Sequence, residues 1–205
     1  MFTGLIREMA EVVSYANNIL TLKANYRPKI GDSIAVNGVC LTVVEVAEGS
    51  FSVELADETR EVIAMENLKG RVHIEPAMQM GDRFEGHIVQ GHVDTVGTIT
   101  HIQKRTNGTD FFISIPANYL QYVIPKGSIT IDGVSLTINE VTEDGFRLTI
   151  IPHTLKETRF SEYRVGTRVN VETDLFARYV AKILEAREVA KRRGWEEIEH
   201  IQSLY

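Results

Sequence analysis

A cysteine and a serine occupy matching places in two similar stretches of the chain. Cys40 lies in NGVCLT, and Ser135 lies in DGVSLT 95 positions later. A thiol is a few per cent ionised at pH 7 and a serine hydroxyl is not, which favours Cys40 as a nucleophile. Cysteine is also a common buried apolar residue, so the residue type alone does not decide its role.

Histidines lie at the junction between the two stretches. His92 in QGHVD can serve as an acid or a base because imidazole titrates near neutral pH, or it can simply bond the backbone. The role of His87, five residues earlier, stays open. No metal site is expected, since further converging ligands are not apparent. The other histidines that we weighed are most simply surface or strand residues, namely His73, His101 and His200.

The elements that must position these residues read as short strands. The runs SIAVNG, LTVVEV, FSVEL and VHIEP recur in order as SITIDG, LTINEV, FRLTI and VNVET. Alternating β-branched runs at this spacing are typical of closed antiparallel barrels, and Asn37-Gly38 and Asp132-Gly133 predict tight turns. We therefore expect a mainly β protein with two tandem, homologous, Greek-key-like barrels over residues 1–86 and 87–172.

The pattern becomes helical from Thr173, with Thr173 or Asp174 as the N-cap. The helix is predicted to end near Gly194, and 173–205 is expected to form an oligomerisation helix and tail. Its apolar stripe packs either on a barrel or on sister helices. The residues of the stripe recur at spacings of three and four: Phe176, Tyr179, Val180, Ile183 and Leu184.

Composition excludes several classes of protein. The 205 residues are 43% hydrophobic and 24% charged, which suits two small cores. A net charge of −6 and a pI near 5.6 disfavour nucleic-acid binding. One cysteine suits a reducing cytoplasm, and the sequence shows neither a secretory h-region nor an apolar run that would span a membrane.

Five motifs in this order resemble the riboflavin synthase family of the lumazine-dismutating type: MFTGLI, NGVCLT, GHIVQGHVD, IDGVSLT and IPHT. The resemblance runs from Met1 through the C-terminal helix. It implies a cofactor-free dismutation of two 6,7-dimethyl-8-ribityllumazine molecules by transfer of a four-carbon unit. The products are riboflavin and 5-amino-6-(D-ribitylamino)uracil, in the last step of riboflavin biosynthesis.

The resemblance also implies an assembly. Family members are homotrimers joined by their C-terminal helices, with each active site between the N-terminal barrel of one subunit and the C-terminal barrel of its neighbour. Association with a lumazine synthase shell is a further family analogy that no stretch here demands. The duplication is then explained, because donor and acceptor are the same compound and need the same type of pocket.

Resemblance assigns residues to both pockets. The catalytic candidates are His92, Cys40, Ser135, Thr137 and Ser33. The first pocket is expected to use Gly4, Leu5, Ile6, Val39, Cys40, Leu41, Thr42, Val53, Glu54, Leu55, Ala56, Asp57, Glu58, Thr59, Gln90, Gly91 and His92. The second is expected to use Lys126, Asp132, Val134, Ser135, Leu136, Leu148, Thr149, Ile150, Ile151, Pro152, His153, Thr154 and Asp174. Several have structural alternatives: strand packing for Thr42 and Thr137, a surface salt bridge for Lys126, and a helix cap for Asp174.

The sequence departs from the family where many members read VNLERA. Here VHIEPA places His73 and Pro76 where asparagine and arginine are usual, and Glu85-Gly86 replaces a glycine pair. The changes affect the connection between the barrels more than the chemistry. A noncatalytic antenna-type protein that binds lumazine or flavin is the alternative function, disfavoured because both repeats keep their motifs. A flavin reductase barrel is a more distant one, since no G-x-G-x-x-G occurs.

Overall fold

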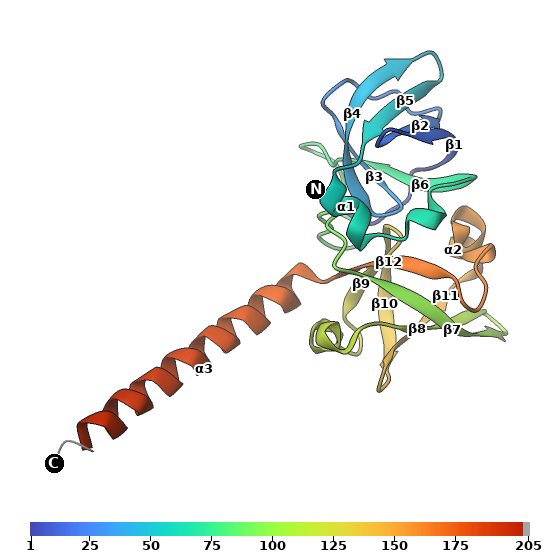
Figure 1. Ribbon diagram of the computed structural model, residues 1–205. Coiled ribbons are helices and arrows are strands. Elements are labelled where there is room, and N and C mark those ends of the chain that lie inside the picture. The colour runs from blue at the N-terminus through green and yellow to red at the C-terminus, as the bar shows by residue number, and fades with distance from the viewer. Residues whose placement is uncertain (203–205) are drawn as a thin grey trace.

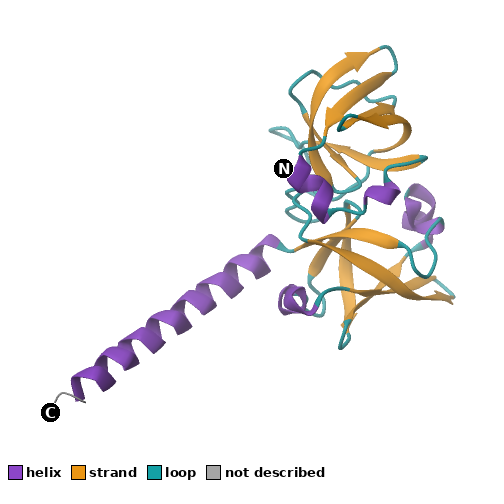
Figure 2. Cartoon of the chain, viewed as in Figure 1, coloured by secondary structure: helices purple, strands orange, loops and turns teal. Residues whose placement is uncertain are grey.

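The computed structural model describes the backbone of residues 1–202 and the side chains of residues 1–191. Two β-barrels are stacked end to end, and a single long helix projects from the second barrel (Figure 1). Short helices lie between and beside the barrels (Figure 2). The predicted fold, two tandem antiparallel barrels followed by a C-terminal helix, is confirmed.

The first barrel is closed by six strands in the order β1-β2-β5-β4-β3-β6. Buried apolar side chains such as Leu20, Val53 and Ile74 fill its core. After β5 the chain forms helix α1 (Asp57–Val62) and the 3₁₀ turn η1 (Met65–Asn67). The strand bounds are β1 Glu8–Ala16, β2 Ile19–Lys23, β3 Ser33–Val36, β4 Val39–Ala47, β5 Ser50–Glu54 and β6 Arg71–Pro76.

The second barrel repeats this order as β7-β8-β11-β10-β9-β12 around its own core. Helix α2 (Pro152–Glu157) follows β11 as α1 follows β5, and η3 (Arg159–Ser161) follows it; η2 (Ala117–Tyr122) lies between β8 and β9. The strand bounds are β7 Thr95–Arg105, β8 Gly108–Ser114, β9 Ser128–Ile131, β10 Val134–Val141, β11 Gly145–Ile150 and β12 Arg168–Thr173.

The two predicted turns are two-residue hairpin turns that meet between the barrels. Asn37 and Gly38 have φ of 44° and 80°, and Asp132 and Gly133 have 45° and 84°. Both positions of such a turn need positive φ, which these residue types tolerate. A Cβ on Gly38 would lie 2.6 Å from the Gly133 nitrogen, so close packing also requires glycine.

Helix α3 (Leu175–Gln202) continues beyond the predicted end at Gly194. An interior glycine costs a helix only about 1 kcal/mol relative to alanine, and the flanking Arg193 and Glu196 favour helix, so Gly194 does not end it. The predicted cap is confirmed at Asp174, whose carboxylate accepts the Phe176 N–H at 2.8 Å. The side chain of His200 and residues 203–205 of the predicted tail lie outside the described part of the chain. None of the described helices is long and apolar enough to cross a bilayer.

Candidate functional site

The first barrel carries an open pocket of about 550 Å³. Its walls come from the start of β4, one face of α1 and the segment that precedes β7. The residues that line it are Val39, Cys40, Glu58, Thr59, Val62, Ile63, Gly91, His92 and Val93. The predicted pocket residues Cys40, Thr59 and His92 are therefore brought together in this structure.

The second barrel carries a smaller pocket of about 150 Å³ built from the corresponding elements. It is lined by Gly4, Leu5, Ile6, Val134, Ser135, His153, Thr154, Glu157 and Thr158. Residues on β10 and α2 lie 95 positions after their counterparts on β4 and α1. The chain thus has two related pockets, one for each repeat.

The third wall of each pocket comes from the segment that leads into the other barrel. We call residues 1–6 and 87–93 the crossing segments. The Ser135 N–H donates to the Gly4 carbonyl at 2.8 Å, and the Cys40 N–H donates to the Gly91 carbonyl at 2.8 Å. The sequence assignment of Gly4, Leu5 and Ile6 to the first pocket is wrong, because the segment that leads into the first barrel crosses to the second.

The two central side chains, Cys40 and Ser135, have different surroundings despite their equivalent positions. Cys40 is half-buried and packs against the apolar cluster of Phe2, Ala35 and Val89. His92 lies exposed at the mouth of the same pocket. The first pocket therefore presents a thiol on an apolar base with an accessible imidazole at the rim.

Ser135 instead belongs to a polar chain. Its Oγ lies 2.7 Å from His87 Nδ1, and His87 Nε2 lies 3.3 Å from Thr130 Oγ1. Burial lowers the pKa of His87, with partial opposition from the charge of Asp174, so the imidazole is neutral near pH 7. In the tautomer with a proton on Nε2, Nδ1 accepts a hydrogen bond from the Ser135 hydroxyl. This bond makes the hydroxyl oxygen a better nucleophile.

His87 is the functional candidate that sequence reasoning left undecided. The only signal was a second histidine in GHIVQGH, and the spacing gave no partner for it. Its contacts are with β9 and β10, 43 and 48 residues away, which only the packed structure brings together.

Other predicted residues lie away from the pocket surfaces. Some side chains in the strands or directly after them fill the barrel cores, so only the backbone of these residues could meet a ligand. These are Leu41, Val53, Leu55, Leu148 and Ile150. Residues beyond the strands, namely Ala56, Asp57, Ile151 and Pro152, are exposed where each strand turns into its helix. Glu54 is exposed at the end of β5, and Leu136 is half-buried in β10.

Asp132 is corrected from a pocket residue to a buried one. It is fully buried, and its carboxylate accepts the Asn170 N–H at 2.7 Å and the Tyr163 hydroxyl. Burial raises its pKa to about 6, although both hydrogen bonds oppose the shift. Asp132 therefore orients a turn and a phenol between the barrels and is not accessible to a ligand.

The remaining candidates are on other surfaces. Thr42 faces Ser33 across the β3–β4 pair and is exposed, as is Thr137 on β10. Lys126 is exposed in a turn with φ of 67°. Thr149 bonds Asp110 at 2.8 Å inside the barrel wall. None of these side chains lines either pocket as the described residues form it.

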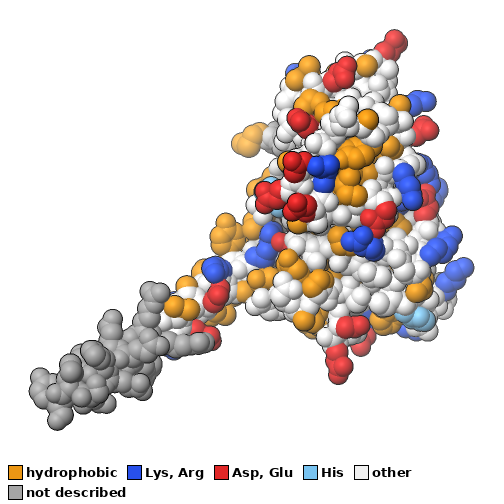
Figure 3. Space-filling view, viewed as in Figure 1, with side chains coloured by type: hydrophobic (Ala, Val, Ile, Leu, Met, Phe, Trp, Pro, Cys, Tyr) orange, Lys and Arg blue, Asp and Glu red, His pale blue; other side chains and the backbone are white. Residues whose placement is uncertain are grey.

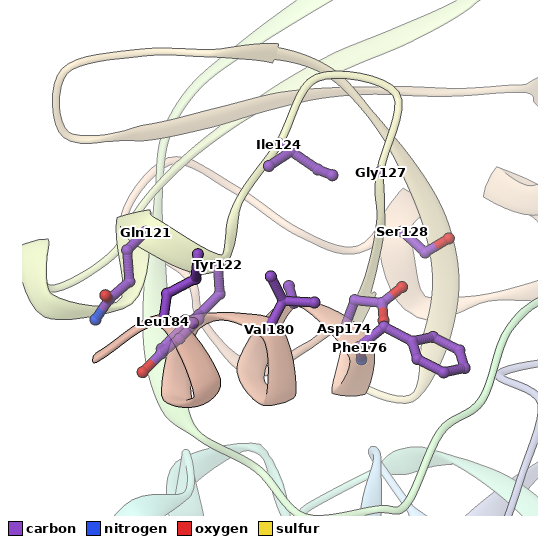
Figure 4. Close-up of a pocket in the computed structure, with 11 residues that line it drawn as sticks. Gln121, Tyr122, Ile124, Gly127, Ser128, Asp174, Phe176, Val180 and Leu184 are labelled. Carbon is purple, nitrogen blue, oxygen red and sulfur yellow. Dashed lines mark hydrogen bonds between the residues drawn. The ribbon is translucent and has the colours of Figure 1, made fainter. Parts of the chain in front are cut away.

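A third cavity of about 370 Å³ lies between α3 and the second barrel. Val180, Leu184 and Phe176 line one side and Tyr122 and Ile124 the other (Figure 4). Asp174 also borders this cavity. Its lining is largely apolar, and apolar side chains gather where the helix leaves the barrel (Figure 3).

Comparison with known proteins gives the family. A model of the lumazine binding domain matches residues 3–77 and again 90–174. The chain is 40% identical to riboflavin synthase of Bacillus subtilis (strain 168) over 193 residues, covering 90% of each protein. It is 39% identical to riboflavin synthase of Photobacterium phosphoreum over 194 residues, covering 90% of this chain and 89% of the relative. The chain belongs to the riboflavin synthase family.

Solved structures support the fold of this riboflavin synthase family member. LumP complexed with riboflavin superposes with a TM-score of 0.74 at 21% identity, covering 84% of this chain and 99% of that one. LumP complexed with 6,7-dimethyl-8-(1'-D-ribityl) lumazine gives 0.72 at 20% identity, with the same coverage. At this level of identity the likeness is one of fold.

The departure from the family pattern at His73 proves to be structural. His73 is a buried residue of strand β6, so of the two expected settings, surface or strand, it has the strand, and burial lowers its pKa to about 4. Its Nδ1 donates to the Asp132 carbonyl at 2.8 Å, and its Nε2 accepts the Arg159 N–H at 2.8 Å. Asn170 makes the matching bond to the Asn37 carbonyl from β12. The histidine therefore preserves a contact between the barrels.

Proposed function

We propose that this chain is a riboflavin synthase. It dismutates two molecules of 6,7-dimethyl-8-ribityllumazine into riboflavin and 5-amino-6-(D-ribitylamino)uracil. The observation that carries the proposal is the pair of related pockets, one in each lumazine binding domain, in a chain about 40% identical to riboflavin synthases. Two molecules of one compound require two pockets of one type.

The reaction needs no external oxidant, because a four-carbon unit moves intact from one lumazine to the other. A base removes a proton from the C7 methyl group of one molecule, and the anion delocalises into the pteridine ring. The other molecule is activated at C7 by addition of a nucleophile, or by addition of a hydride that the first lumazine itself supplies. Stacking the two rings places the reacting carbons near attack distance and removes much of the entropic cost from the chemical step.

We assign roles by pocket. In the first pocket His92 moves the proton, and Cys40 contacts the ligand from the base of the cavity. In the second pocket Ser135, polarised by His87, serves as donor or relay at the reacting end. Ser33 and Thr137 are exposed or half-exposed on their barrels, so we place them where a neighbouring subunit completes the site.

The assembly that we propose is a homotrimer joined by α3. Phe176, Tyr179, Ile183 and Leu184 are each more than half exposed along this helix, and they would be covered by sister helices. The first pocket of one subunit then faces the second pocket of the next. A cytoplasmic location fits the single cysteine, and association with lumazine synthase remains a proposal by family analogy.

The alternative is a noncatalytic lumazine or flavin carrier, and one measurement separates the two functions. Purified protein is incubated with 6,7-dimethyl-8-ribityllumazine alone, and products are followed by absorbance and chromatography. Equal amounts of riboflavin and 5-amino-6-(D-ribitylamino)uracil are expected. Tight binding with no product would instead identify a carrier and remove the catalytic roles of His92 and Ser135.

A further inference from the structure

The crossing segments pair with each other before each reaches a pocket. The Phe2 N–H donates to the Val89 carbonyl at 2.7 Å, and the Val89 N–H donates to the Phe2 carbonyl at 3.1 Å. The His87 N–H donates to the Thr3 carbonyl at 3.2 Å. Each segment therefore lines the pocket of the barrel that it does not lead into, and the two walls form one continuous element.

A buried carboxylate of the first barrel holds the first crossing segment. Glu75 Oε1 accepts the Thr3 N–H at 2.8 Å and the Thr3 hydroxyl at 2.9 Å, while Oε2 accepts the Gly4 N–H at 3.0 Å. Glu75 is only 4% exposed. The carbonyl of the same Gly4 accepts the Ser135 N–H, so one side chain fixes the wall beside Ser135.

A buried carboxylate of the second barrel holds the other segment in the same way. Glu172 Oε1 accepts the Gln90 N–H at 2.8 Å, and Oε2 accepts the Gly91 N–H at 2.9 Å. Glu172 is only 3% exposed. The Gly91 carbonyl in turn accepts the Cys40 N–H.

Burial of Glu75 and Glu172 disfavours their ionised form. Burial raises the pKa of both, to about 7 for Glu172, although the bonds from Gln90 and Gly91 and the charge of Arg178 oppose the shift there. A carboxylate with two acceptor oxygens can hold two consecutive N–H groups at once, which a neutral amide side chain cannot do because its nitrogen is itself a donor. The arrangement therefore depends on the ionised group.

We propose that Glu75 and Glu172 are reciprocal positioning residues, each fixing the wall of the pocket in the opposite barrel. Glu75 of the first barrel holds the segment that lines the second pocket, and Glu172 of the second barrel holds the segment that lines the first. Neither carboxylate is among the residues that line the two related pockets, so each acts on them through the backbone that it holds.

The chain offers a probe that reports on one pocket alone. Cys40 is its single cysteine, and its alkylation rate with iodoacetamide follows access to the first pocket. Glu172→Gln is expected to speed alkylation about tenfold, which is near the lower end of what loss of one hydrogen bond to a charged group would allow. Glu75→Gln is expected to leave the rate unchanged. Glu8→Gln is the matched control, because Glu8 also accepts two consecutive N–H groups, those of Asn25 and Tyr26, away from both pockets.

The reciprocal test moves the thiol to the second pocket. In a Cys40→Ser, Ser135→Cys background, Glu75→Gln is expected to speed alkylation, and Glu172→Gln is expected to leave it unchanged. Equal effects of both variants on both thiols, as a general loss of stability would produce, would overturn the proposal, and so would no effect. The readout does not depend on dismutation, so its failure is separate from failure of the proposed enzyme.

Hydrogen exchange of the unmodified chain covers the case in which a variant does not fold. The amide hydrogens of Thr3, Gly4, Gln90 and Gly91 lie outside the strands but are expected to exchange slowly, because the carboxylates accept them. Exchange of these four amides at the rate of a free peptide would show that the carboxylates do not hold the segments.

Discussion

At the scale of single residues, the chemistry of the second pocket depends on what Ser135 contacts. A serine hydroxyl by itself is a weak acid and a weak nucleophile, and an adjacent neutral imidazole changes both properties. His87 provides that imidazole at 2.7 Å and is itself held by Thr130. The matching position of the first barrel has Cys40 on an apolar base, so the pockets are related in shape and different in chemistry.

Removal of the His87 imidazole is expected to lower turnover strongly. His87→Ala leaves the Ser135 hydroxyl without its acceptor, and loss of a general acid or base typically costs about a hundredfold or more in rate. His101→Ala is the control, because His101 is exposed on β7 and contacts only the ring of Phe112 among the described aromatic groups. Steady-state kinetics with the lumazine measures both; equal rates for the two variants would contradict a role for His87.

At the scale of elements, the crossing segments require glycine where they meet the strands of the pockets. Gly4 and Gly91 both have φ of 79°. A Cβ on Gly91 would lie 2.7 Å from the Cys40 Cβ, and one on Gly4 would lie 2.5 Å from the Ser135 Cβ. These contacts are closer than carbon atoms approach, so any side chain displaces the wall of the pocket.

Gly91→Ala is therefore expected to destabilise the fold by roughly 3 kcal/mol, from the strained φ together with the overlap. Gly81→Ala is a matched control with φ of 95° and no atom within 4 Å of the added Cβ, so it bears the backbone strain alone. Urea unfolding of both variants gives the difference. A loss for Gly91→Ala no larger than that for Gly81→Ala would mean that the segment yields without cost.

At the scale of the whole molecule, the two barrels bury their apolar side chains, whereas helix α3 leaves its apolar stripe exposed. Each barrel closes around its own core, while most of the apolar side chains of α3 that the structure describes, up to residue 191, are exposed. Exposed apolar faces of this kind are typical of subunit contacts. The assembly is thus expected to depend on the helix and the chemistry on the assembly.

Charges placed on the apolar stripe are expected to separate the subunits. In Val180→Asp, Leu184→Asp the stripe carries two charges that association would bury, so sedimentation should find monomers with folded barrels and little dismutase activity. Lys182→Asp changes charge on the exposed polar side of the same helix and should remain assembled. A trimer that survives the double substitution would place the subunit contact elsewhere.

The sequence by itself determined the architecture, because its signals are local. Strands of alternating pattern, the Asn-Gly and Asp-Gly turns and the helical stripe can each be recognised from a few neighbouring residues. The repeat at an interval of 95 residues shows the strand and turn patterns twice. The end of α3 was the exception, since an isolated glycine in a strongly helical context does not stop a helix.

Only the tertiary structure decided how the pockets are completed. Nearly all residues of β6 and β12 are buried, so an alternation of apolar and polar residues could not show that Glu75 and Glu172 are buried against the crossing segments. The contacts of Gly4 with Ser135 and of His87 with Thr130 join residues far apart in the chain. No local pattern encodes such contacts, because they exist only after two closed barrels pack against each other and exchange their leading segments.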